Sequence, residues 1–413
     1  MSRINLTEKL KKLSHRKILN NESKNCSKRK TRKKLRQLTY KTPFRLSKNK
    51  SKTLNFQSLS AKIPCFFTNR LFFGLANRIF KQFMKVFRGV PPEWRKFDCA
   101  VAIGNFDGVH RGHQALLEQT VHAADIRGLL PCAVTFEPHP KEFFSKDGAN
   151  LPRVINMRDR VLDIGACGIQ RIFFLNFNER LASMTPRQFA QEILVEGLHA
   201  RWVTVGEDFH FGAKSAGNVD TLIELGKELG FEVEITPTLF HGGERISSTR
   251  LRQALADNDM FEVTQLLGHH YHVTGRIIHG QQLGRKLGFP TINMDCIPVD
   301  KYGEPAVRGV YAVFVHGLAP YRLAGVATVT SRPTVTEGQP KKYLLETHIF
   351  DYSGDCYGQL ARIEFIEKLR DNQKFANLDE LKTAINADAQ KARQILGLAV
   401  SDDPITELPP DRF

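Results

Sequence analysis

The feature that most constrains the fold of this chain is a regular alternation of short apolar runs and helical stretches between residues 99 and 235. Strands are expected at residues 99–104, 130–136, 171–175, 202–206 and 231–235, and helices at about 111–127, 157–165, 186–196 and 219–229. A β-α-β order of this kind predicts an α/β domain with a parallel, doubly wound sheet. Ligands of such a sheet bind at the carboxyl ends of its strands.

The pattern changes after about residue 270, where strands follow one another without intervening helices. They are expected at residues 271–279, 310–316, 323–327, 343–349 and 361–369, and they predict an antiparallel barrel or sandwich. A helix expected over about residues 377–396 should pack on it. Because 413 residues exceed what one core usually organises, we expect two domains, at residues 84–267 and 268–413.

Positive charge is concentrated at the N-terminal end. The chain carries a formal charge of +17, of which residues 1–83 contribute +21 and residues 84–413 contribute −4. We expect residues 1–60 to be disordered and residues 61–83, with their apolar stripe, to form an amphipathic helix. This basic extension favours an anionic partner, whereas residues 84–413 are expected to bind no nucleic acid. A start of the protein at Met84 is an equally open interpretation of the extension.

Cysteine usage and hydropathy indicate the compartment. Seven widely spaced cysteines form no CxxC pair, which argues against a disulfide framework and favours a reducing environment. No stretch approaches the roughly 18 consecutive apolar residues of a membrane-spanning helix, and the N-terminus has no apolar signal core. We therefore expect a cytoplasmic protein without a membrane span.

The loop after the first expected strand carries the first chemical centre. It reads Gly-Asn-Phe-Asp-Gly-Val-His-Arg-Gly-His over residues 104–113 and opens the first helix. Glycines permit a tight turn, and the free N–H groups of a helix start can bind phosphate oxygens. His110 and His113 are three residues apart, so both imidazoles can face that anion. Such a site suits nucleotidyl transfer, in which donors hold the α-phosphate and the departing pyrophosphate.

Two other interpretations of the histidine pair remain. Two histidines near a turn, taken alone, are more often structural or exposed. A His-x-x-His pair could also be half of a metal site, but no acidic or cysteine ligand at a matching spacing accompanies it.

A second phosphate-binding element is expected at residues 245–250, Arg-Ile-Ser-Ser-Thr-Arg, before a helical stretch rich in Leu and Ala. Hydroxyl residues at a helix start usually act as N-caps, which contribute about 1 kcal/mol of stability. Three hydroxyls followed by an arginine also form a phosphate cradle.

The decapeptide at residues 104–113 resembles the signature of the nucleotidylyltransferase superfamily, in particular its FMN adenylyltransferase branch, and residues 246–250 resemble the second phosphate-binding motif of that family. The resemblance implies a Rossmann-like domain in which His110 and His113 are catalytic. It also implies that residues 135–140 and 205–212 line the nucleotide and flavin clefts. The implied ligands of the ATP are Gly104, Phe106, Gly108, Ser247, Ser248, Thr249 and Arg250.

The second chemical centre is expected in the antiparallel domain. Residues 284–293, Gly-Arg-Lys-Leu-Gly-Phe-Pro-Thr-Ile-Asn, join a basic Gly-rich loop to a strand on which Thr291 and Asn293 point to one side. Two oxygen donors suit a magnesium–nucleotide complex, although a plain Gly-rich hairpin is the alternative. Glu346, on an alternating strand, either faces solvent or accepts a proton during phosphoryl transfer.

Together, residues 284–293 and 345–351 closely resemble riboflavin kinase. The resemblance implies an antiparallel β-barrel with Glu346 as the base. The implied Mg²⁺–ATP site consists of Gly284, Thr291 and Asn293, with Thr291 and Asn293 on the metal. Two departures are Ile292, where Ala is frequent, and Thr330, where Gly is common. We expect Ile292 to point away from the metal. Thr330, which stands where Gly is common, puts the usual backbone conformation of its loop in question.

Residues 84 to about 400 therefore resemble the bacterial bifunctional FAD synthetase family. The resemblance implies phosphorylation of riboflavin to FMN and adenylylation of FMN to FAD, with ATP and Mg²⁺. A different adenylyltransferase, acting on phosphopantetheine or nicotinate mononucleotide, would leave the kinase-like motifs unexplained. A nucleic-acid-binding protein would rely on the basic extension, but no helix-turn-helix or aromatic-rich reader accompanies it.

Overall fold

The structure, a computed structural model, describes residues 84–94, 96–145, 152–280, 284, 288–295, 305–332 and 342–399. The basic extension expected at residues 1–83, with its amphipathic helix, lies outside the described residues. Within the described ranges, no helix combines the length and the apolar character needed to cross a membrane. The cysteines in these ranges are free thiols, namely Cys99, Cys132, Cys167 and Cys356.

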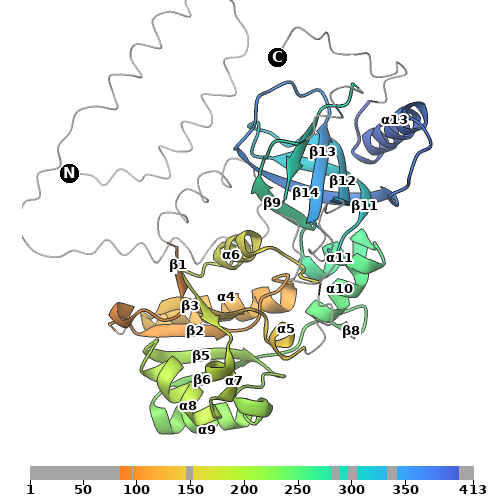
Figure 1. The fold of residues 1–413 in the computed structure, drawn as a ribbon. Coiled ribbons are helices and arrows are strands. Elements are labelled where there is room, and N and C mark those ends of the chain that lie inside the picture. Colours follow the sequence, from red (N-terminus) through yellow and green to blue (C-terminus); the bar gives the residue numbers. More distant parts are fainter. Residues whose placement is uncertain are drawn as a thin grey trace, which may run out of the picture. The chain divides into compact units, whose positions relative to one another are not determined.

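A six-stranded parallel sheet organises the first half of the described chain (Figure 1). The strand order is β1-β4-β3-β2-β5-β6, and each pairing is parallel. The strands are β1 (Lys85–Arg88), β2 (Cys99–Ile103), β3 (Leu130–Glu137), β4 (Arg171–Asn176), β5 (Ala200–Gly206) and β6 (Glu232–Thr236). All five residues of β2 are buried, because the sheet is covered on both faces, and this explains its uninterrupted apolar sequence.

Helices cover both faces of this sheet. On one face, apolar side chains cluster with α4 (Arg111–Arg127), α6 (Met157–Ala166), α10 (Ser248–Ala256) and α11 (Met260–Leu267). On the other face, they cluster with a π-helical turn (Phe189–Val195) and α9 (Val219–Leu229). The predicted doubly wound α/β fold is confirmed. The shorter elements are α5 (Pro140–Phe144), α7 (Glu179–Ser183), α8 (Pro186–Gln188), the 3-10 turns Pro92–Trp94 and Ala213–Ser215, and the hairpin strands β7 (Phe240–His241) and β8 (Glu244–Arg245).

One expected helix differs from the structure. The single helix predicted at residues 186–196 is divided into α8 and the π-helical turn. Thr185 caps α8, and Gln188 completes a capping box by bonding back to the Thr185 backbone. The apolar residues still fall on one face after the change of helical pitch, because Phe189, Ala190 and Leu194 are buried together. Hydrophobic periodicity does not distinguish these two helical forms.

The second half of the described chain is a curled antiparallel sheet of strand order β10-β13-β12-β11-β14-β9, which confirms the predicted barrel (Figure 1). The backbone N–H of Ile278 donates to the carbonyl of Asn293 at 2.8 Å, so the chain beyond β9 joins the opposite edge strand, β10. The strands are β9 (His272–Arg276), β10 (Thr291–Met294), β11 (Gly309–His316), β12 (Leu323–Arg332), β13 (Lys342–Ile349) and β14 (Leu360–Arg370). Helix α13 (Leu378–Ile395) packs on this sheet through Ala389 and Ala392.

The close approach of α9 to the strand that follows it gives a test of the packing. A Cβ atom on Gly226 would lie 2.6 Å from the backbone oxygen of Phe231, whereas one on Gly165 of α6 would meet only the flexible end of Met84. Gly→Ala inside a helix normally raises the free energy of unfolding by about 1 kcal/mol. A clash with a rigid backbone atom lowers it by about 1–3 kcal/mol.

We therefore expect Gly226→Ala to lower the free energy of unfolding in urea and Gly165→Ala to leave it nearly unchanged. Equal stabilities of the two variants would contradict the packing of α9.

Candidate active sites

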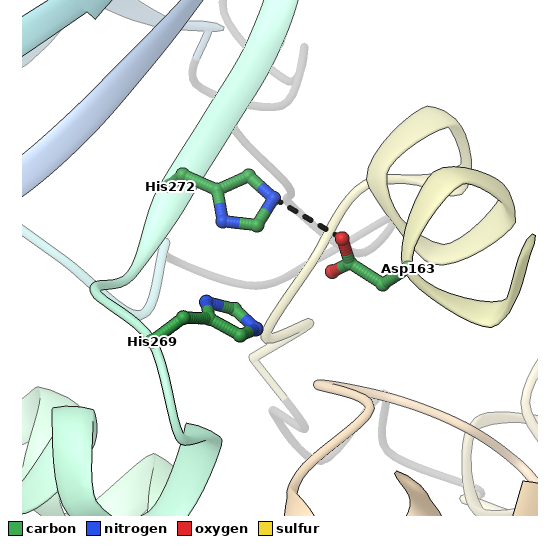
Figure 2. Close-up of side chains that lie close together, drawn as sticks. All are labelled: Asp163, His269 and His272. Atoms are coloured by element: carbon green, nitrogen blue, oxygen red, sulfur yellow. Dashed lines mark ion pairs between the residues drawn. The ribbon is translucent and has the colours of Figure 1, made fainter. Parts of the chain in front are cut away.

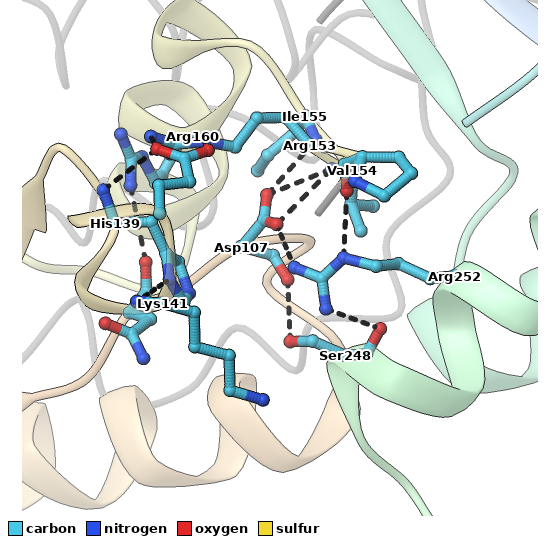
Figure 3. A network of polar contacts seen from close by, with 12 residues as sticks. Asp107, His139, Lys141, Arg153, Val154, Ile155, Arg160, Ser248 and Arg252 are labelled. Carbon is cyan, nitrogen blue, oxygen red and sulfur yellow. Dashed lines mark hydrogen bonds and ion pairs between the residues drawn. The ribbon is translucent and has the colours of Figure 1, made fainter. Parts of the chain in front are cut away.

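A buried carboxylate holds the loop between β2 and α4. Asp107 is 1% exposed, and its carboxylate accepts hydrogen bonds from the backbone N–H groups of Val154 at 3.1 Å and Ile155 at 3.4 Å. Arg252 of α10 forms an ion pair with the same carboxylate, as Figure 3 shows. Because a buried charge is costly without partners, these contacts fix the loop, residues 154–155 and α10 to one another.

The backbone of this loop adopts conformations that side chains rarely permit. Gly108 has φ of +101°, and a Cβ atom there would lie 2.7 Å from Leu251 of α10. Phe106 and Val109 also have positive φ angles, 48° and 39°. Backbone strain of this kind persists only where the surrounding structure enforces it, often at functional sites. Glycine is therefore required at position 108 both by the positive φ angle and by the close approach of Leu251 on α10.

The two predicted histidines lie together at the start of α4. His110 is the N-cap residue, and its Nδ1 accepts a hydrogen bond from the backbone N–H of His113 at 3.3 Å. Their rings stack with centroids 3.7 Å apart, and the ring of Phe106 meets His113 edge-on at 5.3 Å. Phe106 is fully buried, so it supports His113 from behind.

Burial keeps both histidines neutral. Desolvation, together with the charges of Arg245 and Arg252, lowers the pKa of His110 to about 4. Desolvation and the adjacent His110 hold the pKa of His113 well below its usual value. Nδ1 of His113 and Oδ1 of Asn105 are buried and have no hydrogen-bond partner among the described residues. Because such atoms are costly to leave unpaired, a bound ligand is their natural partner.

A second helix begins beside this loop. Ser247 is the N-cap of α10 and accepts a hydrogen bond from the backbone N–H of Arg250 at 3.2 Å, so the N-cap interpretation is correct for this serine. The hydroxyl of Ser248 donates to the carbonyl of Asp107 at 2.8 Å, and Thr249 is exposed. The N-termini of α4 and α10 are therefore neighbours, and each contributes free N–H groups and partial positive charge.

The two arginines of this element differ in their surroundings. The structure places the guanidinium of Arg250 on the carbonyls of His241 and Glu244 and on the carboxylate of Glu262, at 2.8, 2.9 and 2.6 Å. None of these contacts involves His110 or His113. Arg252, which the sequence analysis missed, instead lies at Asp107 and also donates to the Ser248 carbonyl at 3.1 Å. The available sequence signal was that Arg252 follows Ser248 by four residues, so both side chains lie on the same face of the helix.

Residues 135–140, expected to line a cleft, lie next to the same loop. The hydroxyl of Thr135 donates to the carbonyl of Asn105 at 3.0 Å. Burial and the charge of Arg153 lower the pKa of His139 to about 3, and Figure 3 shows His139 close to the arginines that pair with Glu137. The arginines of this network, Arg153 and Arg160, are paired with the carboxylates of Glu137 and Glu142.

Strand register brings the second set of predicted residues together. Asn293 on β10 pairs with Glu346 on β13, which in turn pairs with Thr328 on β12. Thr291 pairs with His348, so these side chains share one face of the sheet. Ile292 belongs to the apolar core, as expected for a residue that alternates with Thr291 and Asn293.

A cavity of about 270 Å³ opens over this face, between the sheet and α13. Asp388 of α13 holds Arg370 of β14 by a bidentate ion pair, with Nη2–Oδ2 at 2.8 Å and Nε–Oδ1 at 3.0 Å, which fixes the helix on the barrel. The polar residues lining the cavity include Thr291, Thr328, Thr330, Glu346, His348 and Asn372.

Two glycines let the backbone approach Thr291 and Asn293 closely. A Cβ atom on Gly284 would lie 2.3 Å from the Phe289 carbonyl and 3.4 Å from the hydroxyl of Thr291. One on Gly280 would lie 2.3 Å from the amide of Asn293. The backbone therefore closes directly over both predicted ligands. Residues 285–287 of the motif lie outside the described residues.

Comparison with known proteins agrees with this arrangement. A family model described as FAD synthetase matches residues 93–250, and one described as riboflavin kinase matches residues 267–396. A crystal structure described as a macrolide-efflux protein from Streptococcus pneumoniae superposes with a TM-score of 0.61 at 27% identity, over 74% of this chain and 97% of that one.

Curated relatives span both matched regions. The bifunctional riboflavin kinase/FMN adenylyltransferase of Escherichia coli K12 is 40% identical over 76% of this chain and 99% of its own length. The Pseudomonas fluorescens protein of the same name is 41% identical over 76% of this chain and 97% of its own length. Since identity and coverage are both high and the two family models match in the same order, this chain belongs to the bifunctional riboflavin kinase/FMN adenylyltransferase family.

Proposed function

We propose that this chain makes FAD from riboflavin in two ATP-dependent steps, at two centres on two different sheets. Residues 268–413 phosphorylate riboflavin to FMN, and residues 84–267 transfer the adenylyl group of ATP to FMN, releasing pyrophosphate. The observation that carries the proposal is the neighbouring N-termini of α4 and α10, locked by Asp107 beside two neutral histidines. The cross-strand set of Asn293, Glu346 and Thr328 supports the kinase step.

In adenylyl transfer, a phosphate oxygen of FMN attacks the α-phosphorus of ATP and pyrophosphate departs. Negative charge builds on the α-phosphate and the leaving group, and fixed donors stabilise it. His110 and His113, neutral because of burial, donate hydrogen bonds to these oxygens, while the two helix N-termini hold the polyphosphate. Gly104 and Gly108 keep the loop close to the nucleotide, and Phe106 supports His113.

Ser247, Ser248, Thr249 and Arg250 were expected as phosphate ligands, and their geometry separates their roles. Thr249 is exposed at the first turn of α10 and is free to turn toward a phosphate. Ser247 and Ser248 contribute mainly through the helix start that they stabilise. Arg250 is engaged by Glu262, and Arg252 is therefore the arginine that we assign to this site as a positioning residue for Asp107.

In the kinase step, the terminal hydroxyl of riboflavin attacks the γ-phosphorus of ATP and ADP departs. Glu346 accepts the hydroxyl proton, and the cavity beneath α13 holds the flavin. Gly284 lets the backbone approach the phosphates. Thr291 and Asn293 offer oxygen atoms on the face shared with Glu346, which fits the oxygen preference of Mg²⁺. When bound there, Mg²⁺ neutralises phosphate charge.

The cysteines in the described part of the chain are free thiols, which is compatible with a reducing compartment, and we propose a cytoplasmic location.

The adenylyl centre is tested by His113→Ala. Removal of one preorganised donor should lower FMN-to-FAD turnover by about 10²–10³ and leave riboflavin phosphorylation unchanged. His122, which is exposed on the same helix, provides the matched control, and His122→Ala should change neither activity. Both products are resolved by chromatography. A parallel loss of both activities in His113→Ala would contradict the catalytic role of this residue.

The kinase centre is tested by Glu346→Gln, which keeps the size of the side chain but removes its ability to accept a proton. Riboflavin phosphorylation should fall by about 10²–10⁴, whereas adenylylation of supplied FMN should continue. Glu367→Gln, an exposed position on β14, is the control. Kinase turnover of Glu346→Gln within about threefold of the unchanged protein would be too high for loss of a general base.

A further inference from the structure

Three side chains converge away from both candidate centres. Asp163 lies on α6, whereas His269 and His272 lie between the end of α11 and the start of β9. One ligand atom from each residue can be chosen so that all three lie within 4.8 Å of one another. Figure 2 shows the two imidazole rings on one side and the Asp163 carboxylate facing them from the helix.

The distance between His272 and Asp163 is informative. Nε2 of His272 lies 3.4 Å from Oδ1 of Asp163 and 3.8 Å from Oδ1 of Asp159. The first distance is longer than the usual N–H···O hydrogen bond of about 2.7–3.2 Å. A tetrahedral Zn²⁺ with bonds of about 2.0–2.1 Å separates its ligand atoms by roughly 3.3 Å. The spacing of this one pair therefore matches an edge of a zinc tetrahedron, and the ligand atom of His269 lies within 4.8 Å of both.

Two carboxylate oxygens at this place have no hydrogen bond among the described residues. Asp159 is fully buried, and its Oδ2 accepts from the backbone N–H of Thr274 at 2.8 Å, while its Oδ1 has no hydrogen-bond partner among the described residues. Oδ2 of Asp163 is likewise buried and without a hydrogen bond. Buried carboxylate oxygens without a hydrogen bond are costly, and a cation satisfies both the charge and the missing contacts.

The protonation of His269 already suits a ligand. Its Nδ1 lies 2.9 Å from the carbonyl oxygen of His270, which can only accept, so Nδ1 carries the proton and Nε2 keeps its lone pair. Metal-bound histidines typically donate their second N–H to a carbonyl or a carboxylate in this way.

His272 requires one rearrangement. Its Nδ1 lies 2.9 Å from a guanidinium nitrogen of Arg362, which can only donate, so Nε2 carries the proton and faces the carboxylates. A cation at Nε2 moves this proton to Nδ1, where the His270 carbonyl is the acceptor at 3.4 Å, and Arg362 gives up its contact. The two carboxylates, Asp159 and Asp163, outnumber the single positive charge of Arg362, so the local charge favours a divalent cation.

We propose that Asp163, His269 and His272 bind a divalent transition-metal ion, with Zn²⁺ favoured by the two-nitrogen, one-oxygen donor set. Water or Asp159 is the fourth ligand of the ion. Asp163 belongs to the region matched by the FAD synthetase model, and both histidines belong to the region matched by the riboflavin kinase model. The ion joins α6 to the start of the barrel and has a structural role.

The experiment uses the full chain, stripped of metal with a chelator and titrated with Co²⁺, whose visible absorption is strong only in a tetrahedral site. We expect one equivalent of Co²⁺ to bind with a tetrahedral spectrum, and one equivalent of Zn²⁺ to displace it and raise the melting temperature. Neither expectation depends on a variant. Absence of a stoichiometric tetrahedral spectrum would overturn the proposal.

Variants then locate the ion. Asp163→Asn and His269→Gln should each weaken Co²⁺ binding at least tenfold and abolish the Zn²⁺-dependent rise in melting temperature. His270→Ala is the matched control, because its ring bonds Thr264 at 3.2 Å and lies between the two proposed ligands in sequence. It should bind Co²⁺ as the unchanged protein does. Unaltered binding in the folded Asp163→Asn and His269→Gln variants would place the ion elsewhere and refute the site.

Discussion

The buried carboxylate of Asp107 is the interaction on which the adenylyl centre depends. It joins a strained loop, the backbone at Val154 and Ile155, and Arg252 of α10 in one network. Without these partners the charge would be too costly to bury. With them, two helix N-termini are fixed as neighbours, and His110 is buried while His113 is half-buried. The phosphate binding that we propose for this site rests on backbone N–H groups whose positions the Asp107 side chain holds.

The kinase centre depends on a different constraint, the register of an antiparallel sheet. A shift of β10 by one residue against β13 would put Asn293 and Glu346 on opposite faces of the sheet. The bridge between Ile278 and Asn293 ties the edge strand β10 to the chain beyond β9, and the ion pair between Arg370 and Asp388 fixes α13 on the sheet. The two proposed centres therefore lie on different sheets, and in the two-step synthesis the FMN formed at one is the substrate of the other.

Sequence reasoning predicted most strands and the long helices, because buried strands and amphipathic helices have periods that can be counted. It also found the histidine loop and the Thr-x-Asn strand, whose residues are adjacent in sequence. It missed the role of Arg252, which acts through a residue 145 positions away. Sequence reasoning also could not predict that Asp163 lies close to His269 and His272, because helix α6 and the segment before β9 meet only through tertiary packing. The π-helical turn at Phe189–Val195 was missed because a local change of pitch leaves the apolar pattern intact.

The central claim is that two independent centres act in sequence through a released intermediate. It is tested most directly by mixing the His113→Ala and Glu346→Gln proteins with riboflavin, ATP and Mg²⁺ and following FAD over time. Each protein alone should form little FAD from riboflavin. The mixture should form FAD after a lag, while FMN made by the first protein accumulates and is used by the second. A mixture as inactive as its separate components would contradict the account.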